Sequence, residues 1–524
     1  MTWKKRTTII IASIIAGLYL VLIFILAALE SGKGSINSLN DAFWYSIATL
    51  TTVGYGDLTP VTPAGRAIGV IFMILATTLL VALISSVVGF MTSQALPLWL
   101  LGRQCDKPWY YFADAGNASR ILASQLKEEE PDSLIIFGIS REQSEEAPDF
   151  PCLFLDVEPA VVLAKKKGHA PQTKMFFMRE DDVFKNYRAL HTASMPADVY
   201  ARTRNGQDTL PGSIHFFHSY DCCARQYWRS HPLTLQETHI VLIGFGYYGQ
   251  SLLERAILTN ILSTDQKIVY HIFGDAAEFL QMHTELSRVF HLDEEGETGD
   301  ALIFHRTSWK ESPEILAQAD RIILCEDDDR TVWENYWLLK RFYVVPGTIH
   351  IRSARAVTGM PCFGASEDIY TPGMVLRTTL NSAAIAMNDL YRRANPAGAM
   401  AWDDLDDLLR QSKIAAADHL LTKVRILLKK DNIYTLNQYY CLKAYERYQK
   451  LSRDQKYQHE LRILEHMRWM RFYTYFNWKH GETVDPILHL HPNICDYADI
   501  PKDKHGSFDF AWELLGQIAP ELSH

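Results

Sequence analysis

The sequence predicts a multidomain chain in which two membrane-spanning helices precede two doubly wound α/β domains and a mainly α C-terminal domain. Three observations predict this order. Two long uncharged runs lie within the first 95 residues. A glycine-rich turn at 239–250 joins an apolar strand to a helix, inside a longer alternation of strands and helices. From residue 395 onward the strand pattern stops, and helical stretches rich in Tyr, Trp and Arg follow.

The two uncharged runs are long enough to cross a bilayer. Residues 7–29 would form roughly 34 Å of helix, and the second run covers 67–94. The first run is too long for a cleavable signal peptide. Basic side chains flank both runs, and such flanks stay on the cytoplasmic side. We therefore expect a multi-pass protein of the plasma membrane with both termini in the cytoplasm. The basic residues are Lys4, Lys5, Arg6, Arg103 and Lys107.

A short motif between the two runs carries the most specific chemistry. Gly54 and Gly56 adopt at low cost the backbone angles that direct successive carbonyls toward a common axis. A stack of such carbonyls from four chains replaces the water shell of a potassium ion. Thr52 would add the innermost oxygens, Tyr55 would pack outward, and Asp57 would place carboxylates at the outer mouth. The predicted selectivity filter is Thr52, Val53, Gly54, Tyr55, Gly56 and Asp57.

A helix too short to span the membrane is expected at 41–50, just before this filter, with Asn40 or Asp41 as its N-cap. Its C-terminal dipole would favour a cation in a central cavity. Span, short helix, filter and span in this order resemble the two-transmembrane potassium-channel pore. Because the motif occurs once and a filter needs four strands around an axis, we expect a homotetramer in the lipid bilayer. The alternative is a signal anchor followed by an unrelated hydrophobic helix.

The pore departs from that family pattern in two places. Related inner helices often bend at a glycine about five turns past the filter, and the comparable stretch 74–78 has none, whereas Gly89 lies near the cytosolic end. Some relatives place a glutamate behind the filter where this chain has Ala48. We therefore expect Asp57 to lack its usual carboxyl partner.

The clearest motif of the soluble part is a G-x-G-x-x-G turn after an apolar strand at 239–243. Such glycines bring a helix N-terminus close to a phosphate, as in Rossmann-like domains. A second strand, 268–273, leads to Asp275, which either binds a ribose hydroxyl or is a solvated aspartate at a strand end. Further strands are expected at 301–304, 321–324 and 348–351. The predicted nucleotide-binding residues are Gly244, Phe245, Gly246, Tyr247, Tyr248, Gly249 and Asp275.

The preceding segment shows the same rhythm with a degraded glycine pattern, of which Gly116 alone remains. This domain either has lost its nucleotide, which we favour, or binds a ligand through other contacts. Its strands are expected at 109–112, 134–137, 152–156, 174–178 and 214–217.

A potassium-channel pore followed by one degraded and one intact Rossmann-like domain resembles channels with tandem regulator-of-potassium-conductance (RCK) domains. The resemblance implies a gating ring of eight such domains from four subunits. It also implies a regulatory ligand, either NAD or an adenine nucleotide, with calcium as an alternative. The acidic run 326–329 either binds calcium or forms a solvated loop. Expected bounds are 1–95 for the pore, 96–107 for a linker, 108–235 and 236–394 for the α/β domains, and 395–524 for the last domain.

Three motif groups in the last domain, around Trp402, Glu465 and His491, resemble the repeat domain of ryanodine receptors (RyR). Their mixture of aromatic, basic and acidic side chains suits a nucleotide-type ligand. Alternatively the tryptophans belong to the core, and Glu465 and Arg468 form a surface pair at i,i+3. His489 and His491 favour a structural role over a metal site. The predicted pocket is Trp402, His419, Glu465, His466, Arg468 and Trp469.

Composition narrows the function further. The formal net charge of −9 argues against a nucleic-acid partner. The eight cysteines include no C-x-x-C pair, so we expect reduced, mostly buried thiols. No set of catalytic side chains and no Walker loop is apparent, and we expect no enzyme. The sequence therefore predicts a ligand-gated potassium channel. Its alternatives are a membrane-anchored nucleotide-dependent oxidoreductase and a sensor that does not conduct.

Overall fold

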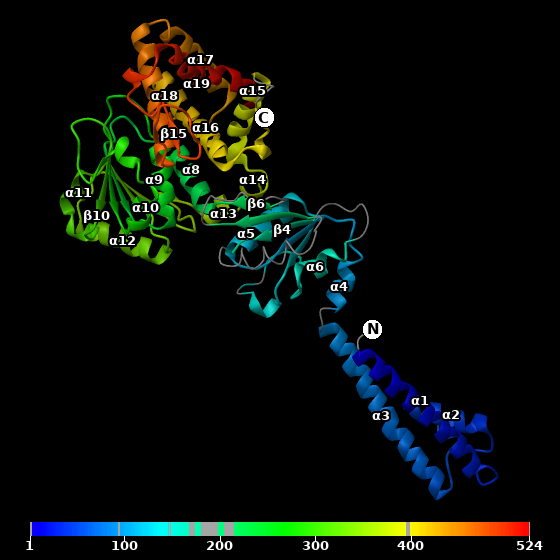
Figure 1. Cartoon of the computed structure of the whole chain (residues 1–524). Helices are drawn as coiled ribbons and strands as arrows, with labels where there is room; N and C mark the ends of the chain where they lie inside the picture. The colour runs from blue at the N-terminus through cyan, green and yellow to red at the C-terminus, as the bar shows by residue number, and fades with distance from the viewer. Residues whose placement is uncertain are drawn as a thin grey trace. The chain divides into compact units, whose positions relative to one another are not determined.

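The structure is a computed structural model that describes residues 3–92, 95–144, 146, 148–166, 173–179, 197–203, 214–394 and 399–522. Its internal contacts divide the chain into two units, Met1–Arg103 and Gln104–His524 (Figure 1). The segment 395–398, where the last domain is expected to begin, lies outside the described residues.

The first unit is helical. The two long helices α1 and α3 pack against the shorter helix α2, around a core that includes Leu26, Ala42, Tyr45 and Phe72. Among the described residues, one helical stretch, Pro63–Gly89, is long and apolar enough to span a membrane by length and composition, and Gly17–Glu30 is a shorter apolar stretch. The helices are α1 (Trp3–Glu30), α2 (Leu39–Leu50), α3 (Pro63–Thr92) and α4 (Ala95–Leu101).

Side-chain caps fix the ends of these helices. Ser38 is the N-cap of α2, so the expectation of Asn40 or Asp41 was wrong. Asp41 instead lies one turn inside the helix, where its carboxylate accepts from Ser38 N at 2.9 Å while Ser38 Oγ accepts from Asp41 N at 3.2 Å. The buried carboxylate of Glu30, at the end of α1, accepts from Val61 N and Thr62 N, just before α3, at 2.9 and 3.0 Å. The last residue of α1 thereby holds the start of α3.

The second unit contains two parallel sheets, each with the doubly wound strand order. The first has six strands in the order β3-β2-β1-β4-β5-β6, all pairs parallel. Helix α5 (Asn117–Glu129) follows β1, and α8 (Ser219–Ser230) leads from β6 into the next domain. The strands are β1 (Trp109–Phe112), β2 (Leu134–Phe137), β3 (Cys152–Phe154), β4 (Thr173–Phe177), β5 (Ala197–Arg202) and β6 (Ile214–Phe217).

The second sheet has seven strands in the order β13-β12-β11-β7-β8-β10-β9. The helices α9 (Tyr247–Thr259), α10 (Ala277–Met282), α11 (Pro313–Gln318) and α12 (Asp329–Phe342) connect its strands. The central strands are buried on both faces, as parallel sheets covered by helices require. The strands are β7 (His239–Ile243), β8 (Val269–Phe273), β9 (His291–Leu292), β10 (Ala301–His305), β11 (Arg321–Leu324), β12 (Thr348–Arg352) and β13 (Cys362–Phe363).

Three of these strands were not expected from the sequence. β5 follows an undescribed segment, and the charged residues Asp198 and Arg202 limit its apolar run to three residues. β9 and β13 are two residues long, and only pairing with β10 and β12 defines them. Short edge strands of this kind depend on their neighbours rather than on local propensity.

The remaining helices form a C-terminal module that packs on the second α/β domain. α16 and α18 both contact α9. The side chains of Ala415, Phe472 and Tyr475 extend the same hydrophobic core that fills the two sheets. The module is therefore continuous with the domain before it. Its main elements are α15 (Ser382–Ala394), α16 (Asp407–Leu428), α17 (Gln438–Leu451), α18 (Gln455–Tyr475), β14 (Lys479–His480), β15 (Leu490–His491) and α19 (Gly506–Ile518).

Candidate functional site

The segment between α2 and α3 has an alternating backbone conformation. Positive φ angles recur at every second residue, with values of 62° at Thr52, 58° at Gly54 and 74° at Gly56. The sequence indicated this conformation for the two glycines, and the structure adds Thr52. Val53 N and Gly54 N both donate to Ala48 O at 3.0 Å, so the end of α2 anchors the start of the segment.

Asp57 has a partner, although not a carboxyl group. Trp44 Nε1 donates to Asp57 Oδ2 at 3.0 Å, and the Trp44 ring stacks on Tyr55 with centroids 5.9 Å apart. An indole on the short helix therefore holds the carboxylate at the far end of the predicted filter. Sequence reasoning missed this contact.

The inner helix α3 runs without interruption through the stretch where a bending glycine is missing. Thr77 Oγ1 donates to Met73 O at 3.0 Å, and Thr78 Oγ1 donates to Ile74 O at 2.8 Å. Threonines that bond back to the preceding turn bend helices in membranes. The position of a hinge stays a prediction.

The glycine-rich turn of the second α/β domain lies where β7 meets α9. Gly244 has φ of 100°, and a Cβ there would lie 2.5 Å from Glu326 N, so both conformation and space require glycine. The turn thereby presents the N-terminus of α9 at the carboxyl edge of the sheet, which is the phosphate position in Rossmann-like folds.

An internal carboxylate lies on that helix N-terminus. Tyr247 N donates to Asp327 Oδ2, and Tyr248 N donates to Asp327 Oδ1, each at 3.1 Å. A Cβ at Gly246 would overlap this carboxylate. The first two amides of α9 therefore already hold an anion, which stands in the position that a phosphate would take. A nucleotide can use these amides only after Asp327 moves.

The acidic run that includes Asp327 is exposed at Asp327 and Asp328, and its carboxylates also have partners within the chain. Asp328 is the N-cap of α12 and accepts from Thr331 N at 2.9 Å. Asp329 pairs with Arg352 and accepts from Ala354 N at 2.8 Å. Burial raises the pKa of Glu326, with Asp327 and Asp328 adding to the effect. Each carboxylate from 327 to 329 thus has a structural partner.

Asp275 lies at the end of β8, as a ribose-binding acid would. One oxygen, Oδ1, accepts from Ala277 N at 3.0 Å and begins α10. The side chain is exposed, so its other oxygen is open to a ligand hydroxyl. Both interpretations of this residue stay predictions.

The first α/β domain places a carboxylate at its own turn. Asp114 Oδ1 accepts from Gly116 N at 2.7 Å and from Ser119 Oγ at 3.0 Å, at the start of α5. This buried acid therefore braces the turn before α5, and loss of the nucleotide from this domain stays a prediction.

The residues predicted for a C-terminal pocket fall into three places. Glu465 is buried between Lys423 and Arg468, and one nitrogen of each lies 2.7 Å from a carboxylate oxygen of Glu465. Glu465 and Arg468 therefore do form an i,i+3 pair, but the expectation that this pair lies on the surface was wrong. Burial alone would raise the pKa of Glu465, but these two cations outweigh it and lower that pKa to about 2. His419 is buried beside them, with Nε2 3.1 Å from Ile261 O. The charge of Glu465 is therefore balanced within the protein by Lys423 and Arg468.

The aromatic members lie elsewhere. His466 Nε2 bonds to Asn493 O at 3.1 Å, and Trp469 packs between Tyr473 and His491 at centroid distances of 4.3 and 4.7 Å. His491 is thus part of an aromatic stack. Trp402 lines a separate cavity of about 610 Å³ between α8 and α16. Among the described residues, the other five predicted pocket residues do not line this cavity.

Several ionic contacts that hold this module were missed by sequence reasoning. Arg225 of α8 makes a two-point contact with Asp418 of α16, at 2.6 and 3.0 Å. Arg471 of α18 binds Asp300 at 2.7 Å. These partners lie between 171 and 193 residues apart in the sequence, so no local spacing could indicate them. None of the eight cysteines, all of which are described, forms a disulfide; four are buried and four half-buried.

Comparisons with known proteins match the pore most directly. The family described as "Ion channel" matches residues 8–93. A voltage-gated potassium channel of Aeropyrum pernix is 46% identical over 55 residues, which are 10% of this chain and 19% of that protein. The potassium voltage-gated channel subfamily A member 10 of Mus musculus is 42% identical over 43 residues, 8% of each chain. The chain therefore spans less than a fifth of the curated relatives it matches.

Two solved structures resemble the chain over a longer stretch at low similarity. The crystal structure of GsuK bound to ADP has a TM-score of 0.38 and 15% identity, and covers 71% of this chain and 99% of that chain. The GsuK channel bound to NAD has a TM-score of 0.37 and 12% identity, and covers 70% of this chain and 83% of that chain.

Proposed function

We propose that the chain is a subunit of a homotetrameric, potassium-selective channel that a ligand of its second unit opens or closes. The observation that carries the proposal is the filter, where positive φ angles alternate along Thr52, Gly54 and Gly56 behind a helix too short to span. The match of residues 8–93 to the ion channel family supports the same function. One filter strand per chain requires four chains around the axis.

The regulatory ligand is proposed to be NAD or an adenine nucleotide at the turn of the second α/β domain. Gly244 and the amides of α9 form the phosphate cradle, and Asp275 faces solvent for a ribose hydroxyl. The carboxylate of Asp327 lies in this cradle. Ligand binding therefore requires an exchange of one anion for another at the helix N-terminus.

The C-terminal module is proposed to sense a second small molecule through the cavity beside Trp402. The carboxylate of Glu465 is already paired with two cations of the chain. The cavity combines an indole with the cation of Arg410 and the carboxylate of Asp403. That combination suits a polar ligand with a flat ring.

Potassium flux from vesicles that contain the purified full chain tests the proposal. We expect potassium efflux that exceeds sodium efflux and changes on addition of NAD⁺ or ADP. Gly56→Ala should abolish flux, because φ of 74° strains any residue with a Cβ, whereas Gly17→Ala on α1 has open space around it and should not. Absence of flux under every nucleotide and calcium condition, or equal flux from both variants, would overturn the proposal.

A further inference from the structure

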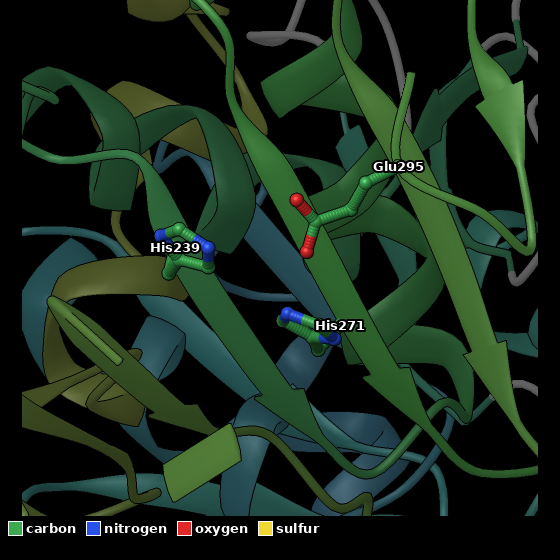
Figure 2. A group of neighbouring side chains, drawn as sticks. All are labelled: His239, His271 and Glu295. Atoms are coloured by element: carbon green, nitrogen blue, oxygen red, sulfur yellow. The ribbon is translucent and has the colours of Figure 1, made fainter. Parts of the chain in front are cut away.

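A cluster of side chains with metal-ligand chemistry lies on the second sheet, away from the glycine-rich turn. His239 begins β7, His271 lies in the middle of β8, and Glu295 lies on the loop between β9 and β10 (Figure 2). Val241 of β7 pairs with His271, so His239 and His271 point to the same face of the sheet. Candidate ligand atoms of the three residues all lie within 4.8 Å of one another.

The spacing suits a small divalent ion. A tetrahedral ion with ligand bonds of about 2.0–2.2 Å holds its ligand atoms about 3.3–3.6 Å apart. Shifts of about 1 Å in the side chains would close the present group to that spacing. Glu295 is exposed and lies on a loop, so its carboxylate has the freedom to make this adjustment.

Each imidazole is held by its other nitrogen, as metal-binding histidines are. His239 Nδ1 lies 3.0 Å from Thr238 Oγ1. His271 Nδ1 lies 3.0 Å from His305 Nε2. Within the described residues, Nε2 of both His239 and His271 has no hydrogen-bond partner. These two atoms are therefore available as ligands beside the Glu295 carboxylate.

The carboxylate of Glu295 keeps one oxygen for an ion. Lys267 Nζ occupies Oε2 at 3.0 Å and leaves Oε1 for an ion. Both residues of that pair are partly exposed, so water screens the repulsion between Lys267 and a bound cation.

We propose that His239, His271 and Glu295 form a binding site for a divalent transition-metal ion of the Zn²⁺ class. Two imidazoles and one carboxylate select such an ion over Ca²⁺ or Mg²⁺, which take oxygen ligands. The ion would tie β7 and β8 to the loop 293–300. That loop ends at Asp300, which Arg471 of the C-terminal module binds, so an ion here stiffens a contact between the module and the sheet.

The test uses the full chain, purified without a histidine tag and stripped with EDTA. Uptake of Zn²⁺ is measured by elemental analysis after dialysis, Zn²⁺ and Ca²⁺ are compared by thermal unfolding, and Co²⁺ is followed by its visible absorption. We expect about one Zn²⁺ per chain, a higher midpoint of unfolding with Zn²⁺ than with Ca²⁺, and a Co²⁺ spectrum typical of nitrogen ligands.

Two variants and two matched controls assign the site. Glu295→Gln and His239→Gln should each weaken Zn²⁺ binding at least 10-fold. Glu294→Gln, the neighbouring exposed acid, and His480→Gln, an exposed histidine of β14, should leave it unchanged. Both ligand changes lie at the rim of the sheet, so folding is preserved and is checked by the unfolding midpoint without metal. No zinc uptake, equal stabilisation by calcium, or equal affinity in all four variants would overturn the proposal.

Discussion

Replacing Asp327 by asparagine should tighten nucleotide binding. The carboxylate takes the amides of Tyr247 and Tyr248, each at 3.1 Å, and a phosphate must displace it. Asparagine keeps the size of the side chain but removes the charge that repels a phosphate. Two unit charges about 4 Å apart in a watery site repel by about 1 kcal/mol, and the anion loses about 0.3–1 kcal/mol of interaction with the helix dipole. The sum of about 1–2 kcal/mol corresponds to a 5- to 30-fold gain in affinity.

Isothermal titration of the full chain with NAD⁺ and with ADP, at one fixed salt concentration, measures the change. Asp328→Asn is the matched control, because it removes the same charge one residue away while asparagine still caps α12. We expect Asp327→Asn to bind 5- to 30-fold more tightly than the wild type, and Asp328→Asn to bind nearly as the wild type does. Equal tightening in both variants would assign the effect to general charge, and weaker binding or none in Asp327→Asn would refute the reasoning.

Three further predictions concern the pore and the buried networks. Trp44→Phe removes the donor to Asp57 and should lower the ratio of potassium to sodium flux; an unchanged ratio would contradict a role for this bond. Glu465→Gln should reduce the free energy of unfolding by about 3–5 kcal/mol, because it leaves buried cations unpaired, whereas the exposed Glu513→Gln should change it little in denaturant titrations. Burial and the charge of Lys423 lower the pKa of His419 to about 3, so the unfolded chain binds a proton that the folded chain does not. Stability should be complete above about pH 6.5 and fall toward pH 3, and His419→Gln should flatten that decline in unfolding curves recorded across this range.

Much of the fold follows from local patterns in the sequence. Uncharged length predicts the membrane helices, and alternation of apolar strands with helices predicts two parallel sheets. The glycines at 54 and 56 indicate a backbone that the structure has. Strands at sheet edges, such as β9 and β13, could not be found in this way, because two residues carry no periodicity of their own.

The candidate sites were predicted less completely. Glu465 and Arg468 are indeed neighbours, but Lys423, which completes their network, lies on another helix and was missed. Trp402 was grouped with them although it lines a separate cavity. A list of residue types suited to a ligand cannot show whether their charges are already satisfied by one another.

The sequence by itself determined the order of spans, filter, glycine-rich turn and helical module, because length, periodicity and glycine placement act within one segment. Only the tertiary structure decided which groups meet. Asp327 reaches the amides of α9 across 80 residues of sequence because β11 pairs with β7 and delivers its carboxyl end beside the turn. His239, His271 and Glu295 converge for the same reason, since adjacent parallel strands place residues far apart in the chain on one face of the sheet. Pairing between strands, rather than any local signal, brings these charges and ligands together.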